Sequence, residues 1–198
     1  MRYCIFGGTF DPPHEGHRYL ARSARDALRL DTVLWVPSQD PPHRPKPSTP
    51  FSDRLAMVRL AMAGMPGQEV SDIEARLPSP SYSLQTILAL KGELGAGHAW
   101  HFLVGADNWD IIRTWHRWED VLREVTMVVF PRQGYPFKEL PAGVLRLDLP
   151  ELDIEARGIR SVLAATGDLE AAGVLAEVRP YIQAHGLYGV PAQGGNTP

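Results

Sequence analysis

Apolar and polar positions alternate with two different periods along the chain, and this pattern predicts its elements. Short apolar runs predict buried strands at residues 3–6, 32–37, 100–104 and 125–130. Weaker runs predict a third strand at 70–74 and a short edge strand at 144–147. Apolar residues at helical spacing predict helices between the strands, including those at 51–64 and 83–94. This alternation predicts an α/β fold, with a mostly parallel sheet and helices on both faces.

The bulk composition fits one domain. The chain has 198 residues, 44% of them hydrophobic, which is enough for one sizeable core. We expect a single domain at 1–188 and a disordered, Gly/Pro-rich tail at 189–198. A net charge of −3 argues against nucleic acid as a general partner. Without a secretory signal or a membrane-length apolar run, we expect a cytoplasmic protein. The single cysteine, Cys4, is expected to be a small core residue.

The segment GGTFDPPHEGH, residues 7–17, joins the first predicted strand to the first predicted helix. Its glycines let the backbone approach a ligand closely, and the helix N-terminus favours an anion such as phosphate. His14 and His17 are three residues apart, so both imidazoles project from the same side of the helix. Each can donate a hydrogen bond to a phosphate oxygen and, when protonated, place a positive charge beside it.

Other interpretations of this segment must be weighed. A Gly-Gly turn after a strand is usually only a turn, and neighbouring histidines are more often surface residues than catalysts. Zinc proteases place two histidines four residues apart in HExxH, whereas these are three apart. The dinucleotide fingerprint GxGxxG and the P-loop GxxxxGK[ST] are both absent from the sequence.

Three more segments follow predicted strands at the edge where parallel sheets bind ligands. The loop at 38–50 holds five prolines and could be only a solvated connection. Asp107 follows the strand at 100–104 and could accept hydrogen bonds from ribose hydroxyls. Arg132 follows the strand at 125–130, where it suits a phosphate or base contact and equally a solvent-facing turn.

Several residues have simpler structural explanations. Ser83 is expected to be the N-cap of the helix that ends at Leu94. Trp109 and Trp118 are expected in the core, as tryptophans at helical spacing usually are. The arginines of the helix at 51–64, Arg54 and Arg59, are expected to be solvated.

The motif at 7–17 resembles the [HT]xGH signature of the nucleotidyltransferase superfamily, and its longer form resembles bacterial nicotinate-nucleotide adenylyltransferases. The similarity extends in fixed order to a Gly-Leu-Tyr ending at 186–188. It implies a Rossmann-like nucleotidyltransferase fold. It also implies adenylyl transfer from ATP to nicotinate mononucleotide, which yields nicotinate adenine dinucleotide and pyrophosphate. Mg²⁺ is implied as a cofactor that arrives with ATP.

The resemblance also implies roles for individual residues. Catalytic roles fall on His14, His17 and Arg160. ATP binding falls on the same three residues and on Gly7, Gly8, Thr9, Phe10, Gly105, Asp107, Arg157 and Ile159. Binding of nicotinate mononucleotide falls on Asp11, His43, Arg44, Ser81, Tyr82, Ser83, Trp115 and Arg132. Among these, Trp115 is expected to stack on the pyridine ring, and Arg44 stands where the family has lysine.

The segment at 153–160 departs from the family, which has Ile-Ser-Ser-Thr before its arginine. This chain keeps Ile154, Ile159 and Arg160 but has Glu155, Ala156 and Arg157 between them. A carboxylate beside phosphates is unfavourable unless it faces away or binds metal. Our hypothesis is that Arg157 supplies compensating positive charge.

Two other functions compete with this one. A different nucleotidyltransferase, such as a phosphopantetheine adenylyltransferase or a cytidylyltransferase, would share the phosphate site and differ in the acceptor site. A nucleotide-binding sensor that has lost catalysis would bind ATP without turnover, and the altered segment at 155–157 is its only support.

Overall fold

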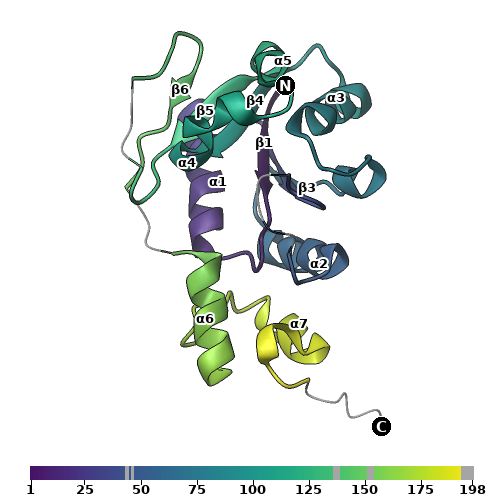
Figure 1. Ribbon diagram of the computed structural model, residues 1–198, viewed down its shortest axis with the longest axis vertical. Coiled ribbons are helices and arrows are strands. Elements are labelled where there is room, and N and C mark those ends of the chain that lie inside the picture. Colours follow the sequence, from purple (N-terminus) through teal and green to yellow (C-terminus); the bar gives the residue numbers. More distant parts are fainter. Residues whose placement is uncertain (43–44, 46, 136–138, 151–153, 193–198) are drawn as a thin grey trace.

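The computed structural model describes residues 1–198 except 43–44, 46, 136–138, 151–153 and 193–198 (Figure 1). Within this part of the chain, six strands form one sheet in the order β3-β2-β1-β4-β5-β6, and every paired neighbour is parallel. The strands are β1 Arg2–Gly8, β2 Thr32–Pro37, β3 Gln68–Val70, β4 Ala99–Gly105, β5 Thr126–Phe130 and β6 Leu145–Arg146. The predicted α/β fold with a parallel sheet is thereby confirmed.

Helices connect the successive strands from β1 to β5, and further helices follow β6. The α-helices are α1 Glu15–Leu28, α2 Phe51–Met62, α3 Ser83–Leu94, α4 Ala106–Asp110, α5 Trp118–Glu124, α6 Ala156–Thr166 and α7 Arg179–His185. Short 3-10 helices are η1 Ile73–Arg76, η2 Ile112–Thr114 and η3 Leu187–Gly189. Among the described residues, none of the helices combines the length and apolar character needed to cross a membrane.

Alternation along the strands divides the core between the two faces of the sheet. On β1, Ile5 packs in a cluster that includes Ile87 of α3 and Val121 of α5. Its neighbour Phe6 packs in a second cluster with residues of α1 and α2. Cys4 belongs to this second cluster and is fully buried, as expected, and burial raises the pKa of its thiol to about 12. Helices therefore cover both faces.

The last helices form a separate layer beside α2 (Figure 1). A third apolar cluster joins Met57 and Ala61 of α2 to Leu163 of α6 and Ile182 of α7. Val190 is 6% exposed and packs in the same cluster, so packed structure extends past 189, where the tail was predicted to begin. Through this layer, the C-terminal segment lies next to the turn that follows β1.

Some local predictions are wrong by a few residues. The third strand ends at Val70, and the next residues form η1, which carries a buried glutamate. Ser83 is the first residue of α3 rather than its N-cap, because Tyr82 is extended and its carbonyl accepts the first amides of the helix. Trp109 is partly buried and packs against the first core cluster, whereas Trp118 is partly buried outside the three clusters, since short helices break the regular spacing there.

Candidate active site

A cavity of about 760 Å³ opens at the carboxyl ends of β1 and β4. These two strands are neighbours, but their connections run to opposite sides of the sheet, which is where open α/β sheets leave a crevice for ligands. Predicted site residues that line it are Gly7, Gly8, Thr9, Phe10, Asp11, His14, His17, Ser81, Tyr82, Ser83, Gly105, Asp107, Trp115, Arg132, Arg157 and Arg160. One cavity thus gathers segments that lie more than a hundred residues apart in sequence.

Three predicted residues are not in this group. Ile159 is 5% exposed and packs in the third apolar cluster, so its side chain supports α6 from behind instead of lining the cavity. The predicted role of Ile159 in ATP binding stays a prediction, and its buried side chain leaves only the backbone for such a contact. His43 and Arg44 lie outside the described residues.

The turn between β1 and α1 has a compact core of its own. Phe10 adopts a left-handed backbone conformation with φ 50°, and its ring is 1% exposed among Phe6, Trp35 and His17. A Cβ on Gly8 would lie 3.0 Å from that ring. Any larger residue at Gly8 would push the ring aside, so this glycine lets the turn fold back onto the sheet.

The two histidines of the turn are stacked and linked by a hydrogen bond. Their ring centroids are 3.7 Å apart, and the backbone N–H of His14 donates to Nδ1 of His17 over 3.2 Å. Because Nδ1 accepts this bond, the neutral His17 ring carries its proton on Nε2. The bond also ties the two residues together at the start of α1.

The surroundings of both imidazoles favour their neutral forms. Burial, aided by the charge of Arg132, lowers the pKa of His14 to about 4. Burial lowers the pKa of His17 well below its usual value, and His14 and Arg132 add to the effect. Neutral rings can donate hydrogen bonds, so the two histidines can act as donors without adding charge to the unliganded site.

A buried arginine that the sequence analysis placed in solvent supports the turn. Arg54 of α2 is 1% exposed, so the prediction that it is solvated is wrong. Its Nη1 donates to the carbonyl of Thr9 over 2.7 Å, and its Nε donates to the carbonyl of Thr49 over 3.1 Å. Arg54 shares its helix face with buried Val58 and Ala61, a spacing that could have revealed it.

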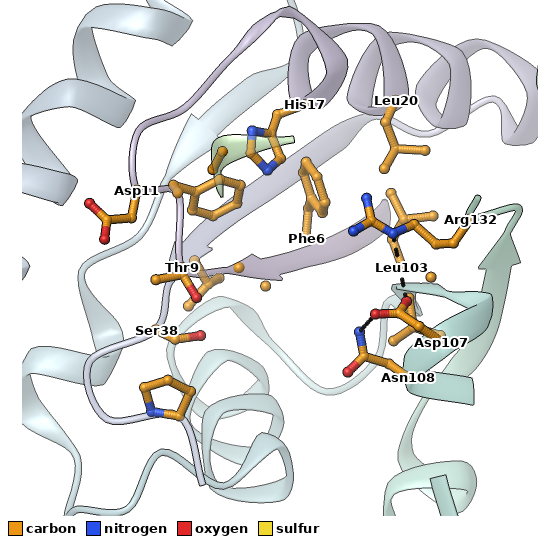
Figure 2. Close-up of a pocket in the computed structure, with 18 of the residues that line it drawn as sticks. Phe6, Thr9, Asp11, His17, Leu20, Ser38, Leu103, Asp107, Asn108 and Arg132 are labelled. Carbon is orange, nitrogen blue, oxygen red and sulfur yellow. Dashed lines mark hydrogen bonds and ion pairs between the residues drawn. The ribbon is translucent and has the colours of Figure 1, made fainter. Parts of the chain in front are cut away.

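The C-terminal layer holds the same turn from the other side. The hydroxyl of Tyr188 donates to the carboxylate of Asp11 over 2.7 Å, and Nη1 of Arg160 donates to the Asp11 carbonyl over 2.5 Å. Figure 2 shows the Asp11 carboxylate directed away from Arg132 and Asp107. The Asp11 side chain therefore anchors the turn, while its predicted contact with the mononucleotide stays a prediction.

Opposite the histidines, Arg132 lies between two carboxylates. Its Nε is 3.8 Å from Oδ1 of Asp107, which follows β4, and its Nη2 is 3.3 Å from Oε1 of Glu155, the N-cap residue of α6. The contact with Asp107 is visible in Figure 2. Arg132 is therefore a cavity residue and not a solvent-facing turn residue.

Aromatic side chains border another part of the cavity. Trp115 packs at the edge of the first core cluster, with its ring centroid 6.0 Å from that of Phe102. Tyr82 stacks on His116 with centroids 4.4 Å apart. Planar rings at the border of a cavity suit a flat heterocycle.

A second buried charged residue that the sequence analysis missed also lines the cavity. Glu74 of η1 is 7% exposed, and its carboxylate accepts the backbone N–H of Gln39 over 2.9 Å and the hydroxyl of Thr86 over 3.0 Å. Burial raises its pKa, while hydrogen bonds from Ser81, Gln39 and Thr86 act in the opposite direction. Glu74 thereby joins the loop after β2 to the segment before α3. Nothing in the apolar pattern marked this carboxylate.

Comparisons with known proteins agree with this architecture. The chain matches the cytidylyltransferase-like family model over residues 5–166. It is 41% identical to a Solibacter usitatus protein named "Probable nicotinate-nucleotide adenylyltransferase", covering 95% of this chain and 100% of that protein. It is 38% identical to a Thermus thermophilus protein of the same name, with the same two coverages.

Solved structures show the same fold at lower identity. The Plasmodium falciparum nicotinic acid mononucleotide adenylyltransferase complexed with NaAD superposes with a TM-score of 0.75 at 18% identity, covering 97% of this chain and 99% of that one. At that identity the similarity concerns the fold alone. From its family match and its curated relatives, the chain belongs to the cytidylyltransferase-like family, among the nicotinate-nucleotide adenylyltransferases.

Proposed function

We propose that this protein transfers the adenylyl group of ATP to nicotinate mononucleotide, giving nicotinate adenine dinucleotide and pyrophosphate in NAD biosynthesis. The main observation behind the proposal is that one cavity is lined by two kinds of side chain, cationic and aromatic. Arg132, Arg157 and Arg160 supply cationic groups for phosphates, and Tyr82 and Trp115 border a place for a flat ring. A bisubstrate reaction between two nucleotides needs both. We further expect the enzyme to act in the cytoplasm.

In the proposed reaction, a phosphate oxygen of the mononucleotide attacks the α-phosphorus of ATP in line. The new P–O bond forms as the bond to the β-phosphate oxygen breaks, and pyrophosphate leaves. The attacking phosphate is already anionic, so no general base is required. Catalysis then consists of bringing two anions together and stabilising charge on the leaving group.

The turn after β1 suits the leaving-group side of this reaction. A neutral His17 would donate its Nε2 proton in a hydrogen bond to a phosphate oxygen, with His14 beside it. Arg160 already has one nitrogen fixed on the Asp11 carbonyl, which orients its guanidinium at the cavity. Arg157 is exposed at the cavity wall, where it could pair with outer phosphate oxygens.

We propose that Mg²⁺ enters with ATP, held by phosphate oxygens and water. Within the described part of the chain, no three His, Cys, Asp or Glu side chains are grouped to hold an ion. Two carboxylates of the cavity wall, Asp107 and Glu155, face Arg132. This arrangement fits an ion that the substrate carries, and the ion would supply charge neutralisation for the departing pyrophosphate.

A pyrophosphate-release assay with ATP and Mg²⁺ tests the function. Nicotinate mononucleotide, nicotinamide mononucleotide and phosphopantetheine are compared as acceptors at equal concentration. We expect turnover with nicotinate mononucleotide and much less with the other two. Turnover with phosphopantetheine alone would refute the acceptor assignment, and ATP binding without turnover on any acceptor would favour a sensor.

A further inference from the structure

The phosphate side of the cavity contains an internal ion pair that joins two distant segments. Arg132 follows β5 and Glu155 begins α6, and their nearest atoms, Nη2 and Oε1, are 3.3 Å apart. Both residues line the cavity. The same guanidinium lies close enough to His14 and His17 to depress the pKa of both rings. A carboxylate therefore rests on the cation that faces the two histidines.

The stem of Arg132 is held in place by its neighbours, whereas one of its two carboxylate partners is exposed enough to move away. A Cβ on Gly105 would lie 2.8 Å from Cγ of Arg132, so the stem of the arginine rests against the backbone at the end of β4. The inner carboxylate, Asp107, has a side chain that is 19% exposed. The outer carboxylate, Glu155, is 53% exposed and can move into solvent.

Glu155 is also free to leave without loosening its helix. Its backbone is extended at the N-cap of α6, but its carboxylate makes no capping hydrogen bond, since it reaches to Arg132 instead. Backbone N–H groups at the start of α6 and the guanidinium of Arg132 both attract anions. A phosphate and the Glu155 carboxylate would thus compete for the same groups.

We propose that Glu155 occupies the place of an ATP phosphate on Arg132, and that ATP binding exchanges this carboxylate for phosphate oxygens. Glu155 is then a determinant of ATP affinity: it weakens ATP binding by holding the cation and by repelling the incoming phosphates. The choice of ATP as ligand rests on the proposed function. The ion pair is half exposed, so its competition with ATP is modest.

Direct calorimetric titration of ATP into the full chain tests this, in EDTA and again with Mg²⁺. We expect E155Q to bind ATP about three- to tenfold more tightly than the wild type in both conditions. E177Q is the matched control, because Glu177 pairs with Arg18 over 3.1 Å with a side chain 48% exposed, and neither residue lines the cavity. E177Q should leave ATP affinity unchanged.

The R132Q background separates exchange from simple repulsion. If Glu155 competes for Arg132, most of the gain from E155Q disappears when Arg132 is already replaced. An equal gain in both backgrounds would overturn the exchange. Unchanged or weaker ATP binding by E155Q would overturn the proposal outright, and weakening only with Mg²⁺ would make Glu155 a metal ligand instead. E155S, which keeps an N-cap residue, serves as the second variant.

Failure of this inference and failure of the proposed function are distinguishable. The titration contains no acceptor, so it reports ATP binding whether or not turnover occurs. Tighter ATP binding by E155Q without turnover on any acceptor would leave the exchange standing and refute the adenylyl transfer. Turnover of nicotinate mononucleotide with no effect of E155Q would do the reverse.

Discussion

Replacing Arg54 with methionine should strongly destabilise the fold, although no substrate needs to touch this residue. Methionine has an unbranched apolar side chain that replaces the apolar stem of arginine, but it donates no hydrogen bond. The substitution R54M therefore removes the two bonds to the carbonyls of Thr9 and Thr49 and leaves both oxygens without that donor. The turn that carries His14 and His17 loses its support from α2.

The expected magnitude follows from the burial and the number of bonds. Arg54 is 1% exposed, so its hydrogen bonds are protected from water. A hydrogen bond from a charged group contributes about 1.5–3 kcal/mol, and two of them set a loss of about 3–5 kcal/mol after some gain from apolar burial. For a chain of this size, 1 kcal/mol corresponds to about 2–4 °C in Tm, so R54M should melt about 6–20 °C lower.

Thermal and urea unfolding of wild type, R54M and R59M measure this effect. Arg59 lies on the same helix, but its side chain is 57% exposed and its pairing with Asp72 at 3.5 Å is a surface contact. R59M should therefore cost less than about 1 kcal/mol. A Tm for R54M within about 4 °C of that of the wild type would refute the reasoning that the buried guanidinium supports the turn.

Three further predictions concern the site itself. H17A should lower kcat about 10²–10³-fold with its fold retained by circular dichroism, because a phosphate donor is lost; near-normal kcat would contradict that role. R157A should raise KM for ATP or lower kcat, and unchanged values for both would end the hypothesis of compensating charge. The pKa of His14 is about 4 in the folded protein, whereas an unperturbed histidine in the unfolded chain has a pKa of 6.5. The unfolded chain therefore takes up the proton first as the pH falls. His14 alone should thus lower the unfolding free energy by up to about 3 kcal/mol between pH 6.5 and 4, in addition to the effect of His17, so urea titrations of H14N should show a smaller fall than those of the wild type.

Local sequence patterns were sufficient to predict those features that depend on a single strand, turn or helix. The apolar runs at β1, β2, β4 and β5 mark buried parallel strands because both faces of such strands are covered. The motif at 7–17 places two histidines at the start of α1 because the turn and the helix start are contiguous in sequence. The resemblance built on that motif also anticipated the family.

Long-range contacts decided the remainder. The spacing of Arg54 with Val58 and Ala61 could have indicated that it faces inward, but its hydrogen bonds to the carbonyls of Thr9 and Thr49 depend on the packing of α2 against the first turn. Ile159 matched the family's motif by position, yet the rotation of α6 turns its side chain into the third core cluster.

Long-range contacts also determine how charged side chains pair. The order of strands and helices, and the polar residues at the ends of β1, β4 and β5, can be derived from the amino-acid pattern alone. The pairing of Glu155 with Arg132, 23 positions away, and of Tyr188 with Asp11, 177 positions away, follows instead from how the folded chain packs. Elements follow from short-range periodicity, whereas burial and pairing of a charged side chain depend on which segments packing brings together.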